Sequence, residues 1–153
     1  YEIKIPAIRT YMHLDTVFTV VDDGLVVAYP NVMNDIREVV RYEPARIFGD
    51  EIIALPVSDN RKFNTILKEE FGRLHVIHTG NNNQRYAARE QLADGTNVFA
   101  ISPSKVITYE RNKMTNLALK DAGVETIQIV GSELVRGLGG PRCMTMPLCR
   151  SNK

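Results

Sequence analysis

Residues 13–29, HLDTVFTVVDDGLVVAY, open the pattern that gives the strongest indication of the fold. They hold a run rich in β-branched and aromatic residues, His13–Val21, and a second apolar run, Leu25–Tyr29, separated by the turn sequence DDG. An Asp-Gly pair between two such runs favours a hairpin, because tight hairpin turns need residues at positive φ. The stretch therefore predicts two adjacent β-strands.

A helix and a returning strand are predicted further along the chain. Arg61–Phe71 carries its apolar residues on one helical face, with Asp59 or Asn60 suited to cap the start and Gly72 suited to end it. Leu74–Ile77 predicts the next strand. Together with the hairpin, these segments make a strand-strand-helix-strand unit.

Two polar segments flank this helix and strand. The segment before the helix is interrupted by prolines at positions 30, 44 and 56, and it predicts only a short helix around Asp35–Val40. The segment after the strand, Gly80–Gln91, predicts a polar loop that leads into a short helix.

The same order of elements occurs a second time. Its predicted segments are the strands Asn97–Ile101 and Lys105–Tyr109, the helix Asn112–Ala122, which stops at Gly123, and the strand Val124–Val130. A unit of this kind cannot bury its own sheet face, so repeated copies are expected to stack on one another. The fold class is α/β in a single domain, and Cys143–Leu148 predicts a last short strand.

Composition excludes several classes of protein. The chain has 153 residues, 44% hydrophobic and 24% charged, with a formal net charge of +1. A balance so close to neutral gives no reason to expect nucleic acid or a membrane as a partner, and no apolar run is long enough to span a bilayer. Two cysteines and no signal peptide favour the reducing cytoplasm. The chain opens at Tyr1 without a methionine, as a fragment, a processed product or an artificial truncation would.

Cys143 is a candidate nucleophile in the sequence LGGPRCMTMP. Gly139 and Gly140 allow a ligand close to the backbone, and the cation of Arg142 favours the thiolate. The alternative is that Cys143 is a small buried apolar residue at the start of a strand. Cys149, which lacks the glycine turn, is interpreted as structural.

His13 and Asp15 are candidate partners of this thiol. Alternate positions of a strand face the same side, so the two side chains would act on one ligand, the imidazole as acid or base and the carboxylate on a cation or on the imidazole. The alternatives are a surface pair at a strand end or a satisfied buried pair. No further ligands at suitable spacing suggest a metal, and His75 and His78 are interpreted as structural.

Three long motifs resemble arginine deiminases, in the order that this family has. Residues 12–22, MHLDTVFTVVD, resemble its histidine motif, and residues 132–150, SELVRGLGGPRCMTMPLCR, resemble its cysteine motif. Residues 87–127 are similar to the segment between them, so the resemblance extends over about Ile5–Arg150. It implies membership of the guanidine-modifying (amidinotransferase or pentein) superfamily. Its fold is a five-bladed α/β propeller, of which the two units would be two blades and the chain the carboxy-terminal, incomplete part.

The resemblance also implies a mechanism. Cys143 would attack the guanidinium carbon of arginine or a related guanidine, ammonia would leave, and a thiouronium intermediate would form. His13 would protonate the ammonia and then activate water, Asp15 would hold the cation, and Gly139 and Gly140 would approach the substrate. Citrulline would be the second product, and no cofactor is used. Further acidic residues of the family lie in blades outside this chain, so a homo-oligomer or association with an amino-terminal portion is expected.

Position 138 departs from the family pattern. Arginine deiminases usually carry RGRGG before the cysteine, and the second arginine helps to bind the substrate carboxylate, whereas residues 136–140 here read RGLGG. Losing such a bond costs about 1.5–3 kcal/mol. Leu138 therefore indicates an altered substrate, a compensating residue elsewhere, or a degenerate module that assembles without turnover.

Overall fold

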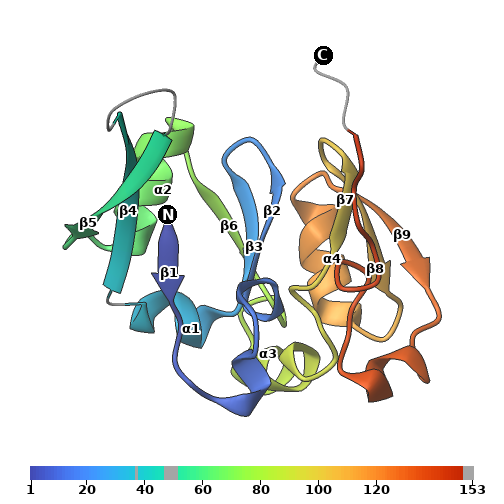
Figure 1. Cartoon of the computed structure of the whole chain (residues 1–153). Helices are drawn as coiled ribbons and strands as arrows, with labels where there is room; N and C mark the ends of the chain where they lie inside the picture. The colour runs from blue at the N-terminus through green and yellow to red at the C-terminus, as the bar shows by residue number, and fades with distance from the viewer. Residues whose placement is uncertain (37, 47–51, 150–153) are drawn as a thin grey trace.

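The computed structural model describes residues 1–36, 38–46 and 52–149. Within these residues the chain is a mixed α/β protein with three small sheets and the α-helices α1–α4 (Figure 1). Two of the sheets belong to the predicted strand-strand-helix-strand units, and the third is built from a long hairpin and the first strand. Arg150, the last residue of the cysteine motif, lies outside the described residues.

The first unit confirms the predicted hairpin. Strands β2 (Phe18–Asp22) and β3 (Leu25–Ala28) pair antiparallel, and the turn between them contains Gly24 at φ 66°. After helix α2 (Phe63–Phe71), strand β6 (His75–His78) returns parallel to β3. The turn residues of the hairpin and the spacing of the apolar residues in the helix therefore predicted the order of these elements correctly.

The second unit repeats this topology. Its elements are β7 (Phe99–Ser102), β8 (Lys105–Tyr109), α4 (Lys113–Asp121) and β9 (Glu125–Ile129). Strand β7 is antiparallel to β8, and β9 is parallel to it. Gly72 and Gly123 follow the two helices at positive φ, as predicted, because a helix commonly ends in a left-handed residue. Helix α3 (Gln84–Gln91), also expected from the sequence, connects the units.

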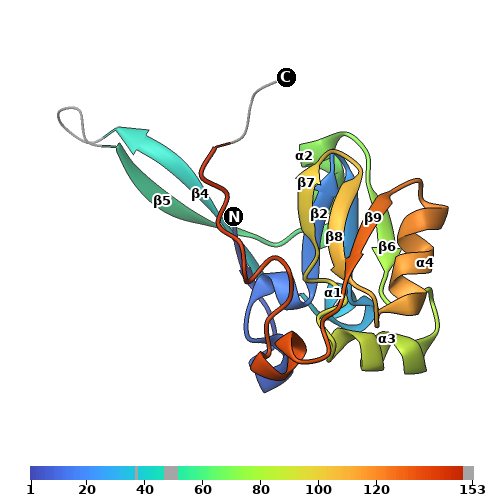
Figure 2. The ribbon, with the colours of Figure 1, turned by 90° about the vertical axis from the view of Figure 1, so that its right-hand side faces the viewer.

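The segment between β3 and α2 differs from the prediction. Helix α1 (Pro30–Asp35) starts at the proline, because the first turn of a helix needs no N–H from it. Strands β4 (Glu38–Arg46) and β5 (Ile52–Asp59) then form a hairpin that reaches away from the two units (Figure 2). The helix expected around Asp35–Val40 is therefore misplaced: Asp35 ends α1, residues 38–40 belong to β4, and residue 37 lies outside the described residues.

The prolines of this hairpin do not prevent its pairing. Strand β1 (Glu2–Lys4) pairs only with the start of β4, so Pro44 lies where β4 has a single neighbour, and Pro56 lies on the edge strand β5. Proline is tolerated at a strand edge because no ladder hydrogen bond is needed there.

Three local predictions were also wrong. The first strand begins at Phe18, not His13, because residues Leu14–Thr16 form the 3-10 turn η2. No strand covers Cys143–Leu148 in the described part of the tail, where residues 141–144 form a turn. Helix α2 has Lys62 at its N-cap position without a side-chain cap, so neither predicted capping residue has that role.

The core shows how the two units stack. On one face of the first sheet, Val26 packs with the apolar side of α2. On the other face, Val27 and Ile77 pack with Leu119 of α4 and Val106 of β8. Fully burying one such side chain stabilises by about 1.5–3 kcal/mol, so the contact between the units is a substantial part of the fold. No helix in the described part of the chain is long and apolar enough to cross a membrane.

Candidate active site

The segment with His13 and Asp15 is shaped by local hydrogen bonds. The carbonyl of His13 accepts from the N–H of Thr16 at 3.1 Å and from its hydroxyl at 2.7 Å. Such side-chain to backbone bonds compete with strand pairing, which is why η2 replaces the predicted strand. His13 is exposed and Asp15 is half-buried. The two side chains therefore share a site because of a tight turn and not because of strand alternation.

Residues from the middle of the chain hold this segment in place. The Gln91 side chain, at the end of α3, donates to the carbonyls of Thr10 at 2.7 Å and Thr16 at 3.4 Å. The hydroxyl of Thr96 donates to the carbonyl of Asp15 at 3.1 Å. Gln91 and Thr96 are both buried, so these bonds are shielded from water and fix the segment on the body of the protein.

The turn with Cys143 is held by two other buried residues. Asn97 accepts from the Cys143 N–H through Oδ1 at 3.0 Å, and the Tyr109 hydroxyl donates to the carbonyl of Gly139 at 2.7 Å. Gly140 lies so close to Asn97 that a Cβ there would be 2.5 Å from its Oδ1. Cys143 itself is exposed and forms no disulfide. The alternative of a small buried residue at the start of a strand is therefore wrong, and the role of Cys143 as nucleophile stays a prediction.

Two consecutive residues thus form hydrogen bonds to the histidine motif and to the cysteine motif. Thr96 holds Asp15, and Asn97, the next residue, holds Cys143. Both Thr96 and Asn97 have no exposed surface. An open hollow of about 500 Å³ lies here, lined by His13, Asp15 and Arg142 together with residues of β2. The structure therefore brings the histidine motif and the residue before Cys143 to one hollow.

Two residues that line this hollow have buried polar atoms without partners among the described residues, Asp15 Oδ1 and Thr19 Oγ1. Asn97, which binds the Cys143 N–H, has a third such atom, Nδ2. Leaving a buried polar group unpaired costs about 1–3 kcal/mol. Groups of this kind are typical of a site that is completed by a ligand.

Asp94, which was not predicted from the sequence, is a buried carboxyl close to the candidate site. It is 7% exposed, and burial, with a smaller contribution from the charge of Asp15, raises its pKa to about 6. Burial, then Asp94 and Cys143, raise the pKa of Tyr109. These electrostatic contacts place Asp15, Asp94, Tyr109 and Cys143 in one neighbourhood. The available signal was the polar sequence DGTN at residues 94–97 directly before a strand.

The predicted substrate contacts at Gly139 and Gly140 stay predictions. The structure shows that the Gly139 carbonyl is used by Tyr109 and that Gly140 packs against Asn97. Cys149 is also exposed and free. In the described part of the chain no group of three or more His, Cys, Asp or Glu residues could hold a metal ion.

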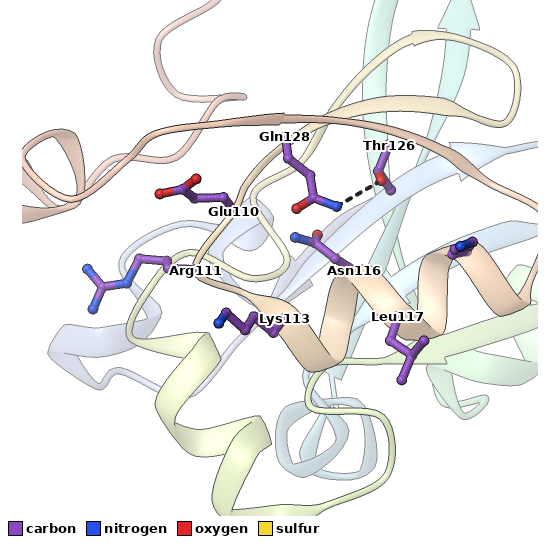
Figure 3. Close-up of a pocket in the computed structure, with 8 residues that line it drawn as sticks. Glu110, Arg111, Lys113, Asn116, Leu117, Thr126 and Gln128 are labelled. Atoms are coloured by element: carbon purple, nitrogen blue, oxygen red, sulfur yellow. Dashed lines mark hydrogen bonds between the residues drawn. The ribbon is translucent and has the colours of Figure 1, made fainter.

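A second hollow, of about 670 Å³, lies between α4 and β9 (Figure 3). Arg111, Lys113 and Lys120 line it together with one acid, Glu110. The Gln128 side chain points to the Thr126 hydroxyl at 3.4 Å across its floor. A surface with this excess of positive charge repels a guanidinium cation, so the hollow beside His13 is the better candidate.

Comparison with known proteins agrees with the sequence motifs. The family model described as arginine deiminase matches residues 1–150. Arginine deiminases from Mycoplasma capricolum subsp. capricolum and Listeria welshimeri are 43% and 41% identical to the chain over 151 and 152 residues. Each match covers 98% of this chain and 36% of the relative, so the chain spans about a third of the length of these relatives.

A solved structure is similar in fold. An amidinotransferase from Microseira wollei, of the saxitoxin biosynthetic pathway, aligns with a TM-score of 0.58 over 93% of this chain and 34% of its own length. The sequence identity is 20%, so this likeness concerns the fold alone.

Proposed function

This chain belongs to the arginine deiminase family, and we propose that it contributes a thiol, an imidazole and a carboxylate to the hydrolysis of arginine to citrulline and ammonia. The Cys143 thiolate attacks the guanidinium carbon, the C–N bond to a terminal nitrogen breaks, and ammonia leaves with a proton from His13. His13 then takes a proton from water, which attacks the thiouronium carbon and releases the thiolate and citrulline. Asp15 holds the planar cation by charge-assisted hydrogen bonds.

The main support for the proposal is that two consecutive buried residues form hydrogen bonds to the histidine motif and to the cysteine motif. Thr96 bonds to Asp15 and Asn97 bonds to Cys143, and the hollow beside them contains buried polar atoms without partners. Asp15 Oδ1 is one of these atoms, and a carboxylate oxygen without a donor is suited to a cationic N–H ligand. We place the protein in the cytoplasm, because a nucleophilic thiolate has to stay reduced.

We also propose that the two units are neighbouring blades of a propeller that a further portion completes. In the first unit, Val27 and Ile77 pair across the sheet and are buried against the second unit. The equivalent pair in the second unit is Ile107 and Ile127, and Ile127 is 38% exposed. A face that is buried in one copy and open in the other is suited to receive another strand-strand-helix-strand unit.

We infer that the open sheet face with Ile107 and Ile127 binds an amino-terminal portion of the propeller. The alternative is that it binds another copy of the chain. The family relatives have about three times the length of this chain, since it covers 36% of them. Arginine hydrolysis by this chain is therefore expected only when the remaining blades are present.

Leu138 favours a second candidate substrate. It is 50% exposed and takes a left-handed conformation with φ 57°. Its side chain has no group that pairs with a carboxylate, so a guanidine compound without a carboxylate at this position is the alternative to arginine.

A citrulline assay tests the proposal. The chain is incubated with arginine alone and mixed with a matching amino-terminal fragment of an arginine deiminase. Turnover is expected only in the mixture. To test the effect of Leu138, arginine is replaced by agmatine, a guanidine that lacks the carboxylate; its ureido product is not citrulline, so the released ammonia is measured in that arm. No turnover with either compound in a mixture that does associate would contradict catalysis and favour a module that assembles without turnover.

The two cysteines provide a matched control. Cys143→Ser is expected to abolish turnover in the mixture, because a hydroxyl is a far poorer nucleophile than a thiolate. Cys149→Ser removes a second exposed thiol only six positions away in the sequence and is expected to leave turnover unchanged. Equal loss in both variants would contradict the assignment of Cys143.

A further inference from the structure

The side-chain amide of Asn97 has two different environments. Its Oδ1 accepts from the Cys143 N–H at 3.0 Å, whereas its Nδ2 is buried and has no partner among the described residues. The backbone carbonyl of the same residue accepts from the Arg142 N–H at 3.3 Å. One buried residue thus binds two successive N–H groups of the cysteine turn, and its side-chain amide still has an unpaired donor in the described part of the chain.

Steric contact reinforces these hydrogen bonds. A Cβ at Gly140 would lie 2.5 Å from Asn97 Oδ1, 2.6 Å from its Cβ and 2.8 Å from its Cγ. Only a glycine permits this approach, because a side chain would have to push the amide away. Asn97 has no exposed surface, so neither contact is replaced by water without rearrangement.

We propose that Asn97 is a positioning residue that holds the Cys143 backbone through Oδ1 and offers its unpaired Nδ2–H to the negative charge that forms at this cysteine. A hydrogen-bond donor beside a thiolate favours the charged form and so lowers the thiol pKa. The inference rests on the proposed function in one respect, namely that Cys143 is the nucleophile.

Alkylation of the two cysteines tests this role without any turnover. The full chain is treated with iodoacetamide between pH 5 and 9, and the rates at Cys143 and Cys149 are followed separately by peptide mass spectrometry. In the parent, Cys143 is expected to react faster than Cys149 and at lower pH. Asn97→Ala is expected to slow Cys143 at neutral pH by about tenfold, the factor that matches a net hydrogen-bond loss of ~1.4 kcal/mol.

A conservative variant separates positioning from general stability. Asn97→Asp keeps the shape and the acceptor for the Cys143 N–H but replaces the donor with a carboxylate. The midpoint of the Cys143 pH profile is expected to move to higher pH in this variant, while Cys149 keeps its own profile. The new charge disfavours the thiolate by itself, so this variant tests whether the Asn97 side chain lies close to the sulfur. An unchanged Cys143 profile in a folded Asn97→Asp chain would contradict the proposed contact, and the uncharged Asn97→Ala variant then measures the loss of the donor.

Glycine variants test the same contact from the opposite side. Gly140→Ala is expected to displace the Asn97 amide and to slow Cys143, whereas Gly137→Ala, with nothing within 4 Å of an added Cβ, is the matched control in the same loop. If the pH profile of Cys143 alkylation in the Asn97 variants and in Gly140→Ala is the same as in the parent, the proposed role of Asn97 is wrong, whereas Cys143 can still be the nucleophile. Equal alkylation of both cysteines already in the parent would overturn this role and the proposed nucleophile together.

Discussion

Replacing Asp94 by asparagine should stabilise the chain, and the gain should depend on pH. Asp94 is 7% exposed, and burial together with the charge of Asp15 raises its pKa from 3.8 to about 6. The folded chain therefore binds the Asp94 proton more tightly than the unfolded chain does. Well below pH 4 the carboxyl is neutral in both states. Between about pH 4 and 6 it is ionised mainly in the unfolded chain, so the free energy of unfolding falls as the pH rises.

The size of the effect follows from the shift in pKa. A difference of about two pKa units corresponds to ~3 kcal/mol at most. The open hollow beside Asp15 lets solvent screen part of the charge, so we expect about 1–2 kcal/mol above pH 7. Asp94 also has a positive φ of 57°, which asparagine tolerates well, so Asp94→Asn should carry a small extra gain that is the same at every pH.

Urea unfolding between pH 4 and 8 measures both contributions. The difference between Asp94→Asn and the parent should be small at pH 4, grow between pH 4 and 6, and stay constant above pH 7. Asp121→Asn, which changes an exposed carboxyl on α4, is the control and should show no such growth. A difference that does not change with pH, or a variant less stable than the parent at pH 7, would show that the buried Asp94 carboxylate does not destabilise the folded chain.

Three further predictions concern association and packing. Ile127→Asp should weaken binding to the amino-terminal portion in sedimentation experiments and change the stability of the chain alone by less than about 1 kcal/mol, because Ile127 is 38% exposed; unchanged binding would contradict the proposed face. Glu90→Gln should destabilise by about 1–3 kcal/mol in urea, because the buried Glu90 carboxylate accepts two backbone N–H groups at the start of α4. A value near zero would show that these bonds are easily replaced. Gly131→Ala should lower the stability by about 1–3 kcal/mol, because its Cβ would lie 2.2 Å from the Tyr109 ring, and Gly137→Ala should be neutral; equal effects of the two would argue against this contact.

Short-range chemistry explains what could be predicted about the fold. The Asp-Gly turn at Gly24, the apolar face of α2 and the glycines after both helices are signals contained within a few residues. They were sufficient for two strand-strand-helix-strand units in the right order. The hairpin β4–β5 was missed because edge strands tolerate proline, and whether a strand lies at an edge is decided by its neighbours.

The residues proposed as nucleophile and partners were candidates from the sequence alone, but the reason why His13 and Asp15 line one hollow was not predicted. His13 and Asp15 were expected on a strand, whereas the Thr16 hydroxyl draws them into a 3-10 turn. Local hydrogen bonding and strand formation compete for the same backbone groups, and packing of the neighbouring sheet decides between them.

The repeated unit and the three motifs could be predicted from the amino-acid sequence, since each depends on residues close together in the chain, and the proposed chemistry rests on these motifs. The residues that hold the candidate site together were identified only in the folded chain. Thr96 donates a hydrogen bond to Asp15, 81 positions away in the sequence, and Asn97 accepts one from Cys143, 46 positions away. Burial, with a smaller contribution from the charge of Asp15, raises the pKa of Asp94. Burial and hydrogen bonding between distant segments exist only in the folded chain, because no local pattern specifies which parts of the chain will meet.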